Sequence, residues 1–379
     1  MAEAVAWPAF LASAAISLLT SFVLVARLER VGERLGFSEA LLGVAAALAA
    51  DAPEVTAAVT AVVHHEQRVG AGVVIGSNVL NLAALLGLSA LIAGRIGLHR
   101  KVVVLGGAVA LWMAVVCLGV VLGLMPAVAG LVLALAVVTL YLIALGTEGR
   151  GLGWLTLPRR WASWLQSAVS EEELELGTAI RPRRGRWQDG VVAGVSLLVV
   201  VVASVIMERA AAGLGARYAV PEIVVGGLVL AAVTSLPNAV AAIYLAARGR
   251  GAATLSTALN SNTLNVAMGW LLPSAIIGLG SPSGEAVLIT IWYVGLTLAV
   301  LAFAYRQRGL GRRTGILIIA AYLMFAVSVG ASGYAIPAGP EVIAALGVVT
   351  AVTLAAGLAI GPPRGKQRRQ GAAVPPMRH

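Results

Sequence analysis

The residues of this 379-residue chain that could do chemistry are polar side chains within otherwise apolar segments. Two of them are acidic, and Asp51 and Glu54 lie three residues apart, a spacing that lets both face one cavity. The others carry hydroxyl or amide groups: Ser77, Asn78, Asn81, Thr234, Ser235, Asn238, Asn260, Ser261, Asn262 and Asn265. Sulfur and imidazole are absent from this set, and oxygen ligands of this kind suit hard cations such as Na⁺ and Ca²⁺.

The rest of the chain is too apolar for a soluble protein. Hydrophobic residues make up 59% of it and charged residues only 12%, whereas about a quarter of an average soluble domain is charged. A bilayer solvates apolar side chains while helices satisfy their own backbone, so we expect an all-α polytopic membrane protein. The single cysteine, Cys117, excludes a disulfide framework.

Apolar segments of about 20 residues, the length that crosses a bilayer, predict eleven spanning helices. They are 4–26, 39–63, 70–94, 102–124, 126–146, 189–207, 221–247, 252–279, 285–303, 314–333 and 341–361. With the N-terminus outside, alternate threading puts 24 of the 27 Lys and Arg residues inside and leaves only Arg68, Arg209 and Arg217 outside. This pattern follows the positive-inside rule and explains the net charge of +10 without nucleic acid as a partner. We therefore expect a cytoplasmic C-terminus and the inner membrane of a prokaryote.

Two blocks of sequence, 39–90 and a matching stretch within 221–274, align without a gap when 184 is added to the first set of numbers. Both contain Ser-Asn-x-Leu-Asn, at 77–81 and 261–265, and the match is informative because asparagine is costly in lipid. By the predicted threading, the blocks cross the membrane in opposite directions. Such inverted-topology repeats occur in many secondary transporters, with the binding site near the midplane between the repeats.

These repeats divide the chain into two halves of five spans each, plus one extra C-terminal span. The expected parts are a first membrane half (1–146), a cytoplasmic loop (147–188), a second membrane half (189–361) and a basic tail (362–379). Within the loop, Trp161, Trp164 and Leu165 recur at helical spacing and predict a short amphipathic helix over 154–169 on the cytoplasmic surface. We interpret the loop as a connector between the halves.

Proline interrupts the two repeats at matching positions. Pro53 and Pro237 each remove a backbone N–H and disfavour helical geometry at the preceding residue, so each helix is expected to break there. The carbonyls that a break frees can ligate a cation. Gly76, matched by Asn260 in the second repeat, is expected to interrupt the span that follows.

The two acidic residues favour a functional interpretation over a structural one. A charge in mid-membrane costs about 3 kcal/mol on insertion scales, and neighbouring carboxylates also repel each other. Asp51 and Glu54 are tolerable there only with a cation bound or a proton taken up. Asn78 and Asn262 suit a second role as well, because their amides could hold the broken helices together.

Other acidic residues, and two histidines, are expected at the membrane edges. His64, His65 and Glu66 fall at the outer end of a span, where a solvated loop is expected rather than a metal site. Glu208 and Glu222 also lie near the predicted outer surface and are expected at helix ends.

The motifs resemble those of the sodium/calcium exchangers, within the wider cation/calcium antiporter superfamily. In that family each inverted repeat carries Gly-Thr-Ser-x-Pro-Glu, followed by Gly-Ser-Asn-x-x-Asn or Gly-Ser-Asn-x-x-Asp. Here the first copy is Ala-Ala-Asp-Ala-Pro-Glu (49–54) with Gly-Ser-Asn-Val-Leu-Asn (76–81), and the second is Val-Thr-Ser-Leu-Pro-Asn (233–238) with Asn-Ser-Asn-Thr-Leu-Asn (260–265). The resemblance implies a cation antiporter with alternating access, in which Ca²⁺ and Na⁺ compete for overlapping sites. It implies these cation ligands: Glu54, Ser77, Asn81, Thr234, Ser235 and Ser261.

The chain departs from the family pattern at the acidic positions. Asn238 replaces the acidic residue after the second proline, Asn265 stands at the last acidic position, and Asp51 stands where the family has serine. Both central carboxylates therefore lie in the first half. We include Asp51, Asn238 and Asn265 among the predicted cation ligands and expect altered ion selectivity or stoichiometry.

The leading hypothesis is a secondary active antiporter that exchanges Ca²⁺ against Na⁺, without a cofactor and without enzymatic activity. A proton-coupled or monovalent-cation exchanger is the alternative transporter. A membrane sensor or enzyme that reuses the fold is the alternative of another class, but no nucleophile or catalytic set lies near Asp51. Both a monomer and a homodimer fit the sequence. The spans 4–26 and 189–207, which precede the two repeats, are expected to move against them as gates.

Overall fold

The computed structural model describes residues 3–37, 39–146, 158–177, 185–278, 283–337 and 339–359, and nearly all of them are helical. In chain order the elements are α1 (Glu3–Leu35), α2 (Glu39–Ala50), α3 (Ala52–Val63), α4 (Gln67–Asn81), η1 (Leu82–Leu88), α5 (Ser89–Ala93), β1 (Arg95–Gly97), α6 (Arg100–Val121), α7 (Ala127–Gly146), α8 (Arg159–Gly177), α9 (Trp187–Arg217), α10 (Glu222–Val224), η3 (Val225–Leu230), α11 (Ala231–Thr234), α12 (Leu236–Ala247), α13 (Gly251–Leu264), η4 (Asn265–Leu271), α14 (Leu272–Ile277), α15 (Gly284–Gln307), β2 (Gly309–Gly311), α16 (Arg312–Gly333) and α17 (Gly339–Ala359).

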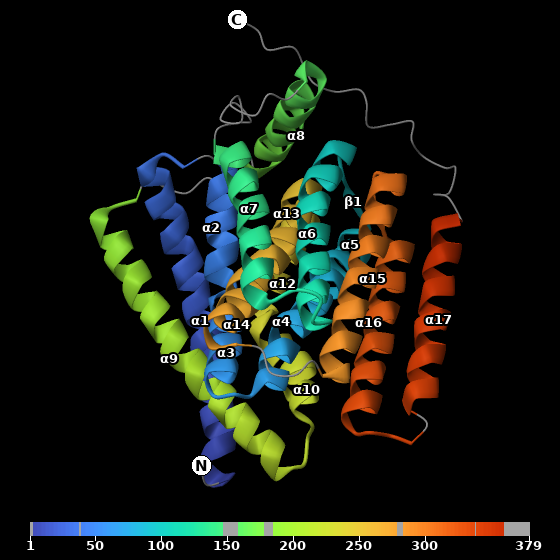
Figure 1. The fold of residues 1–379 in the computed structure, drawn as a ribbon. Helices are drawn as coiled ribbons and strands as arrows, with labels where there is room; N and C mark the ends of the chain where they lie inside the picture. Colours follow the sequence, from blue (N-terminus) through green and yellow to red (C-terminus); the bar gives the residue numbers. More distant parts are fainter. Residues whose placement is uncertain are drawn as a thin grey trace, which may run out of the picture.

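The helices stand side by side and present apolar side chains outward (Figure 1). Leu19, Leu198 and Val352, for example, are 62–66% exposed, an arrangement suited to lipid rather than water. By length and composition, eight helices in the described ranges can cross a membrane, or ten if each of two bent pairs is one span. One expected span, 252–279, is not among these ten. It corresponds to α13, η4 and α14, which follow one another without a break but carry several hydroxyl and amide side chains.

The two ends of the helix bundle differ. One end carries α8 together with a small sheet in which β1 and β2 pair antiparallel, Ile96 opposite Leu310. This end is called the α8 face. The opposite end holds the loop between α3 and α4, where Glu66 lies, and is called the Glu66 face; it is at the bottom of Figure 1. The purely helical expectation missed the sheet, which ties the connection after α5 to the connection after α15.

The helix α8 corrects the expectation for the long loop. It begins at Arg159 and runs to Gly177, while 154–157 of the expected helix lie outside the described residues. Instead of resting only on a membrane surface, α8 packs against α2, α6 and α13, with Ala168 and Val169 fully buried. The Lys101 ammonium also donates a hydrogen bond to the Ser167 hydroxyl. The described part of the loop is therefore docked onto the bundle.

The two repeats cross the bundle in opposite directions. From its start, α2–α3 runs from the α8 face toward the Glu66 face, whereas α10–α12 runs the other way (Figure 1). In each repeat the next long helix, α4 or α13, changes to π geometry at a matching place, as η1 and η4. The helices continue unbroken through Gly76 and Asn260, so the expected interruption at these two positions is wrong.

The helices that precede the repeats form a pair. Both α1 and α9 are long, they lie against each other for much of their length, and they flank one side of the bundle (Figure 1). The hydroxyls of Ser17 and Ser204 are 2.9 Å apart in their buried interface. At the end toward the α8 face, Arg27 and Asp189 form an ion pair at 2.6 Å. These contacts join α1 to α9 at two depths.

Candidate cation-binding site

Both repeats break beside a proline. The helix α2 ends at Ala50, and α3 leaves it at an angle of 53°. In the second repeat, α11 ends at Thr234, and α12 leaves it at 48°. Pro53 and Pro237 lie in the first turn of the new helix, where a missing N–H has no helical partner to lose. The two breaks bring the ends of four helix segments together in the interior.

The acidic residues occupy the first break. Asp51 is the residue between α2 and α3, and Glu54 lies in the first turn of α3. Both side chains are fully buried. The start of a helix carries a partial positive charge from its unpaired N–H groups, so α3 offsets part of the cost of burying two negative charges. Further stabilisation comes from the second repeat.

Three polar groups of the second repeat contact the two carboxylates. The Ser235 hydroxyl donates to Glu54 Oε1 at 2.8 Å, and the Asn238 amide donates to Asp51 Oδ1 at 2.6 Å. These contacts are equivalent, because residue 51 matches 235 and residue 54 matches 238 in the repeat. The Ser261 hydroxyl also donates to Asp51 Oδ1, at 2.6 Å. The first repeat thus supplies the negative charge, and the second supplies neutral donors.

Four asparagines link the second helices of the two repeats in a symmetric set of hydrogen bonds. The Asn78 amide donates to the backbone carbonyl of Asn262 at 3.2 Å, and the Asn262 amide donates to that of Asn78 at 3.1 Å. Asn81 donates to Asn262 Oδ1 at 3.1 Å, and Asn265 donates to Asn78 Oδ1 at 3.2 Å. All four residues are buried. The Asn78 and Asn262 amides are used in holding the repeats together, whereas Asn81 and Asn265 keep an oxygen each.

Five buried side-chain oxygens in this cluster have no hydrogen-bond partner. They are Asp51 Oδ2, Glu54 Oε2, Asn81 Oδ1, Asn238 Oδ1 and Asn265 Oδ1. A buried polar atom without a partner is costly, and all five are acceptors, so cations are partners that would suit them. In the described part of the chain, no group of three or more His, Cys, Asp or Glu side chains forms a metal site. This candidate site is instead two carboxylates completed by amide oxygens.

The remaining predicted residues make hydrogen bonds to partners outside this group of five oxygens. The hydroxyls of Ser77 and Thr234 are buried and donate to carbonyls of their own helices, those of Val74 and Leu230, at 3.0 Å in each case. Their oxygens keep lone pairs for a ligand. Asn260 lies at the edge, 8% exposed, where its Oδ1 accepts a 3.2 Å hydrogen bond from the Tyr141 hydroxyl. No motif in the sequence indicated Tyr141, because an isolated tyrosine in an apolar span has no local signature.

Glycines bring α4 against η3 between the cluster and the Glu66 face. A Cβ on Gly72 would lie 2.7 Å from the amide nitrogen of Gly227, and a Cβ on Gly76 would collide with the carbonyl of Gly227. Gly76 therefore permits a close helix crossing and does not break its helix. A cavity of about 860 Å³ on the Glu66 face reaches Val69 of α4 but not Ser77. The eight residue steps from Val69 to Ser77 span about 12 Å of helix, and the glycine crossing lies within that interval.

Comparison with protein families gives a match over most of the chain. The family described as "Sodium/calcium exchanger protein" matches residues 5–147 and 190–330. Sodium/potassium/calcium exchanger 4 of Mus musculus and of Homo sapiens are each 26% identical to this chain over 137 residues. The matched stretch covers 34% of this chain and 22% of the length of each relative.

Solved structures share the fold. A crystal structure of the H⁺/Ca²⁺ exchanger CAX has a TM-score of 0.64 at 14% identity, covering 93% of this chain and 92% of that one. The sodium-calcium exchanger NCX_Mj, soaked with 2.5 mM Na⁺ and 0.1 mM Ca²⁺, has a TM-score of 0.53 at 19% identity, covering 86% of this chain and 98% of that one. These likenesses concern the arrangement of the helices.

Proposed function

Because the chain belongs to the sodium/calcium exchanger protein family, we propose that it is a secondary active antiporter exchanging Ca²⁺ against Na⁺ by alternating access. Its relatives are exchangers, which are transporters rather than enzymes. The proposed cation ligands are Asp51, Glu54, Ser77, Asn81, Thr234, Ser235, Asn238, Ser261 and Asn265.

The observation that carries this proposal is the set of five unpaired, buried oxygens around two carboxylates. Two come from acids of the first repeat, Asp51 and Glu54, and one comes from Asn238 of the second. Asn81 and Asn265 supply the other two from matching positions. Hard cations of the Ca²⁺ type take six to eight oxygen ligands, so the set is a large part of such a shell. Hydroxyl oxygens and water would complete it.

Charge balance gives a physical basis for exchange. Asp51 and Glu54 together carry two negative charges in a buried place, with no basic side chain among their hydrogen-bond partners. One Ca²⁺ neutralises them, and so do two monovalent cations. Without either, the buried charges remain uncompensated, and crossing between the two access states is strongly disfavoured. A protein of this kind moves only when loaded, which couples the flux of one ion to that of the other.

The departure from the family pattern keeps the charge in the same place. Asn238 occupies the family's second acidic position, and Asp51 of the first repeat supplies a carboxylate instead. The Asn238 amide and the Asp51 carboxylate are in direct contact at 2.6 Å, so the carboxylate lies one hydrogen bond away from the family's acidic position. We therefore infer that the charge suited to one divalent ion is retained, while the geometry around it differs.

We further infer that the α8 face is cytoplasmic and that the chain crosses the inner membrane of a prokaryote eleven times. The inner segments predicted from charge include the connections that hold β1, β2 and α8, and these share one end of the bundle. The extra helix α17 then ends on the cytoplasmic side, and the predicted basic tail (362–379) lies outside the described residues.

The gates that we propose are α1 and α9. They contact each other more extensively than any other helix pair in the described ranges, and they reach the repeats chiefly through α2 and α3. A unit of this kind can slide or rock against the repeats without breaking its internal contacts. A reversible cross-link between cysteines at Ala49 and Val200, which belong to one buried cluster, is expected to stop transport until it is reduced. Undiminished flux in the cross-linked protein would refute this gating.

The decisive experiment is ⁴⁵Ca²⁺ uptake into proteoliposomes loaded with Na⁺, then with K⁺, then with a proton gradient. We expect uptake driven by Na⁺ and lost in both Asp51→Asn and Glu54→Gln. The matched control is Glu222→Gln, which removes an exposed carboxylate from the Glu66 face and should leave uptake unchanged. Uptake driven only by protons would assign the chain to proton-coupled exchange. The absence of Ca²⁺ flux under every gradient would overturn the proposal.

A further inference from the structure

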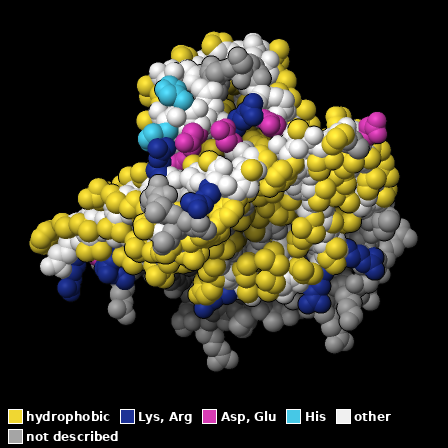
Figure 2. Space-filling view, turned by 90° about the horizontal axis from the view of Figure 1, so that it is seen from below, with side chains coloured by type: hydrophobic (Ala, Val, Ile, Leu, Met, Phe, Trp, Pro, Cys, Tyr) yellow, Lys and Arg dark blue, Asp and Glu magenta, His cyan; other side chains and the backbone are white. Residues whose placement is uncertain are grey.

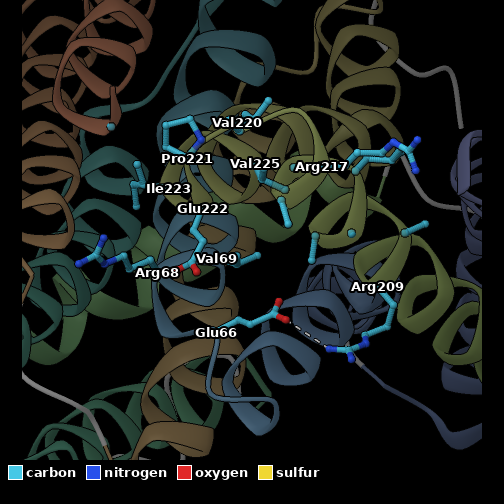
Figure 3. A pocket seen from close by; sticks show the side chains of 18 of the residues that line it. Glu66, Arg68, Val69, Arg209, Arg217, Val220, Pro221, Glu222, Ile223 and Val225 are labelled. Atoms are coloured by element: carbon cyan, nitrogen blue, oxygen red, sulfur yellow. Dashed lines mark hydrogen bonds and ion pairs between the residues drawn. The ribbon is translucent and has the colours of Figure 1, made fainter. Parts of the chain in front are cut away.

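A second group of unpaired carboxylate oxygens lies on the Glu66 face, away from the central cluster. The cavity of about 860 Å³ there is bounded by the α3–α4 corner, α9, the start of α10 and α15. Figure 2 looks onto this face and shows acidic, basic and histidine side chains gathered beside a broad hydrophobic surface. Glu66 and Arg209 both line the cavity and point toward each other, joined by an ion pair at 3.3 Å (Figure 3).

Glu208 is the unexpected member of this group. The sequence suggested that it lies at a helix end, but α9 continues to Arg217 and buries the side chain completely. Neither of its carboxylate oxygens has a hydrogen-bond partner. The carboxyl of Glu208 lies within hydrogen-bonding reach of that of Glu66, and Arg209 is the nearby positive charge. Glu66 Oε2 is also buried and without a partner.

The charges of this group do not balance. Two carboxylates and one guanidinium leave one negative charge, and Arg209, 43% exposed, engages only Oε1 of Glu66. A completely buried carboxylate without a donor is strongly unfavourable, and a second carboxylate beside it makes the cost greater. The other charged residues that line the cavity have other places: Arg68 pairs with Glu285 at 3.4 Å, Glu222 is exposed, and the Arg217 side chain points away from Glu66 (Figure 3).

We propose that Glu66 and Glu208 form a second cation site, distinct from the central one, that binds a hard monovalent cation of the Na⁺ type. Three buried oxygens of these two carboxylates have no donor: Glu66 Oε2, Glu208 Oε1 and Glu208 Oε2. A single positive charge neutralises the group, and water from the adjoining cavity can complete the ligand shell. A proton shared between the carboxyls would form a single O–H···O bond and leave one buried oxygen of the three unpaired.

The position of this site gives it a separate role. Glu66 precedes the first turn of α4, about 16 Å along the helix from Ser77, and the glycine crossing lies between. Glu208 belongs to α9, whereas Glu66 belongs to the corner between α3 and α4. A bound cation therefore links α9 to the first repeat at the Glu66 face. Occupancy of the site would strengthen this link beyond the exposed Arg209–Glu66 pair alone.

The test is equilibrium binding of ²²Na⁺ to the purified full-length chain with both central carboxylates removed, in the variant Asp51→Asn/Glu54→Gln. We expect a single class of Na⁺ sites to remain in this background. Adding Glu208→Gln or Glu66→Gln should abolish it, while adding Glu222→Gln, from the wall of the same cavity, should leave it intact. Because the central carboxylates are absent, the result is independent of which ions the central site exchanges.

A second measurement guards against variants that fail to fold. Crystals of the unaltered protein soaked in Tl⁺, a heavy stand-in for monovalent cations, should show an anomalous peak within ligand distance of Glu66 Oε2 and the Glu208 carboxylate. Residual Na⁺ binding that survives Glu208→Gln would overturn the proposal. So would a background variant without residual binding together with Tl⁺-soaked crystals that show no peak there, the result expected if the pair takes up only a proton.

Discussion

The amide of Asn238 donates a 2.6 Å hydrogen bond to Oδ1 of Asp51, joining the first turn of α12 in the second repeat to the helix break of the first repeat. In sequence the two residues are 187 positions apart. In space they are the acid and the amide of one buried pair. This relationship explains how a chain with an asparagine at a family acidic position keeps two carboxylates in one cluster.

The Asp51–Asn238 contact predicts that the charge can be moved across it. Asp51→Asn should lower Na⁺-driven Ca²⁺ uptake at least tenfold, since the loss of a charge against a buried divalent ion exceeds about 1.4 kcal/mol. The double variant Asp51→Asn/Asn238→Asp restores both the charge and the pairing, and should recover much of the uptake. Proteoliposome flux measures both. A double variant no better than Asp51→Asn alone would show that the carboxylate must stand at residue 51, between α2 and α3.

The reciprocal amides predict equal effects from the two repeats. Asn78→Ala and Asn262→Ala each remove a donor from a buried backbone carbonyl of the other helix, at a cost of about 1–3 kcal/mol. Thermal unfolding in detergent should therefore shift downward by similar amounts for the two variants. Asn260→Ala is the matched control. Asn260 lies at the edge of the cluster, where it accepts a hydrogen bond from Tyr141, so its loss should lower the unfolding temperature less. Strongly unequal shifts for Asn78 and Asn262 would contradict the symmetric arrangement.

The glycine crossing predicts a sharp sensitivity to a single methyl group. Gly76→Ala places a Cβ against the backbone of Gly227, which cannot move aside as a side chain would, and overpacking of this kind costs about 1–3 kcal/mol. We expect lower thermal stability and slower exchange. Gly194→Ala in α9 is the control, since its Cβ meets open space and alanine is the better helix former. If both variants exchange ions at the wild-type rate, α4 and η3 do not cross this closely in the working protein.

The proposed orientation predicts which engineered cysteines a membrane-impermeant maleimide can reach in intact cells. The native Cys117 is fully buried and should not react. A cysteine replacing His64, exposed at the Glu66 face, should be labelled from outside, whereas one replacing Ser170, exposed on α8, should be labelled only after the cells are opened. Labelling in the opposite sense would invert the topology.

Sequence alone determined the parts of this protein that repeat or that follow from hydropathy. The length of the apolar segments indicated the membrane helices, because about 20 apolar residues are stable across a bilayer whatever packs beside them. Pro53 and Pro237 marked the helix breaks, since a missing N–H acts locally. The polar residues Asp51, Glu54 and Asn238 were recognisable because polar groups are rare in such segments.

Tertiary structure alone decided which of these groups meet. Nothing near Asp51 in the chain indicates that its partners are Asn238 and Ser261, because the pairing arises from packing two inverted repeats against each other. The role of Gly76 also reversed: a glycine that looked like a helix break is required by the backbone of Gly227, far away in sequence. Burial of Glu208 depended on how far α9 extends and on what packs beside it, and local hydropathy carries neither kind of information.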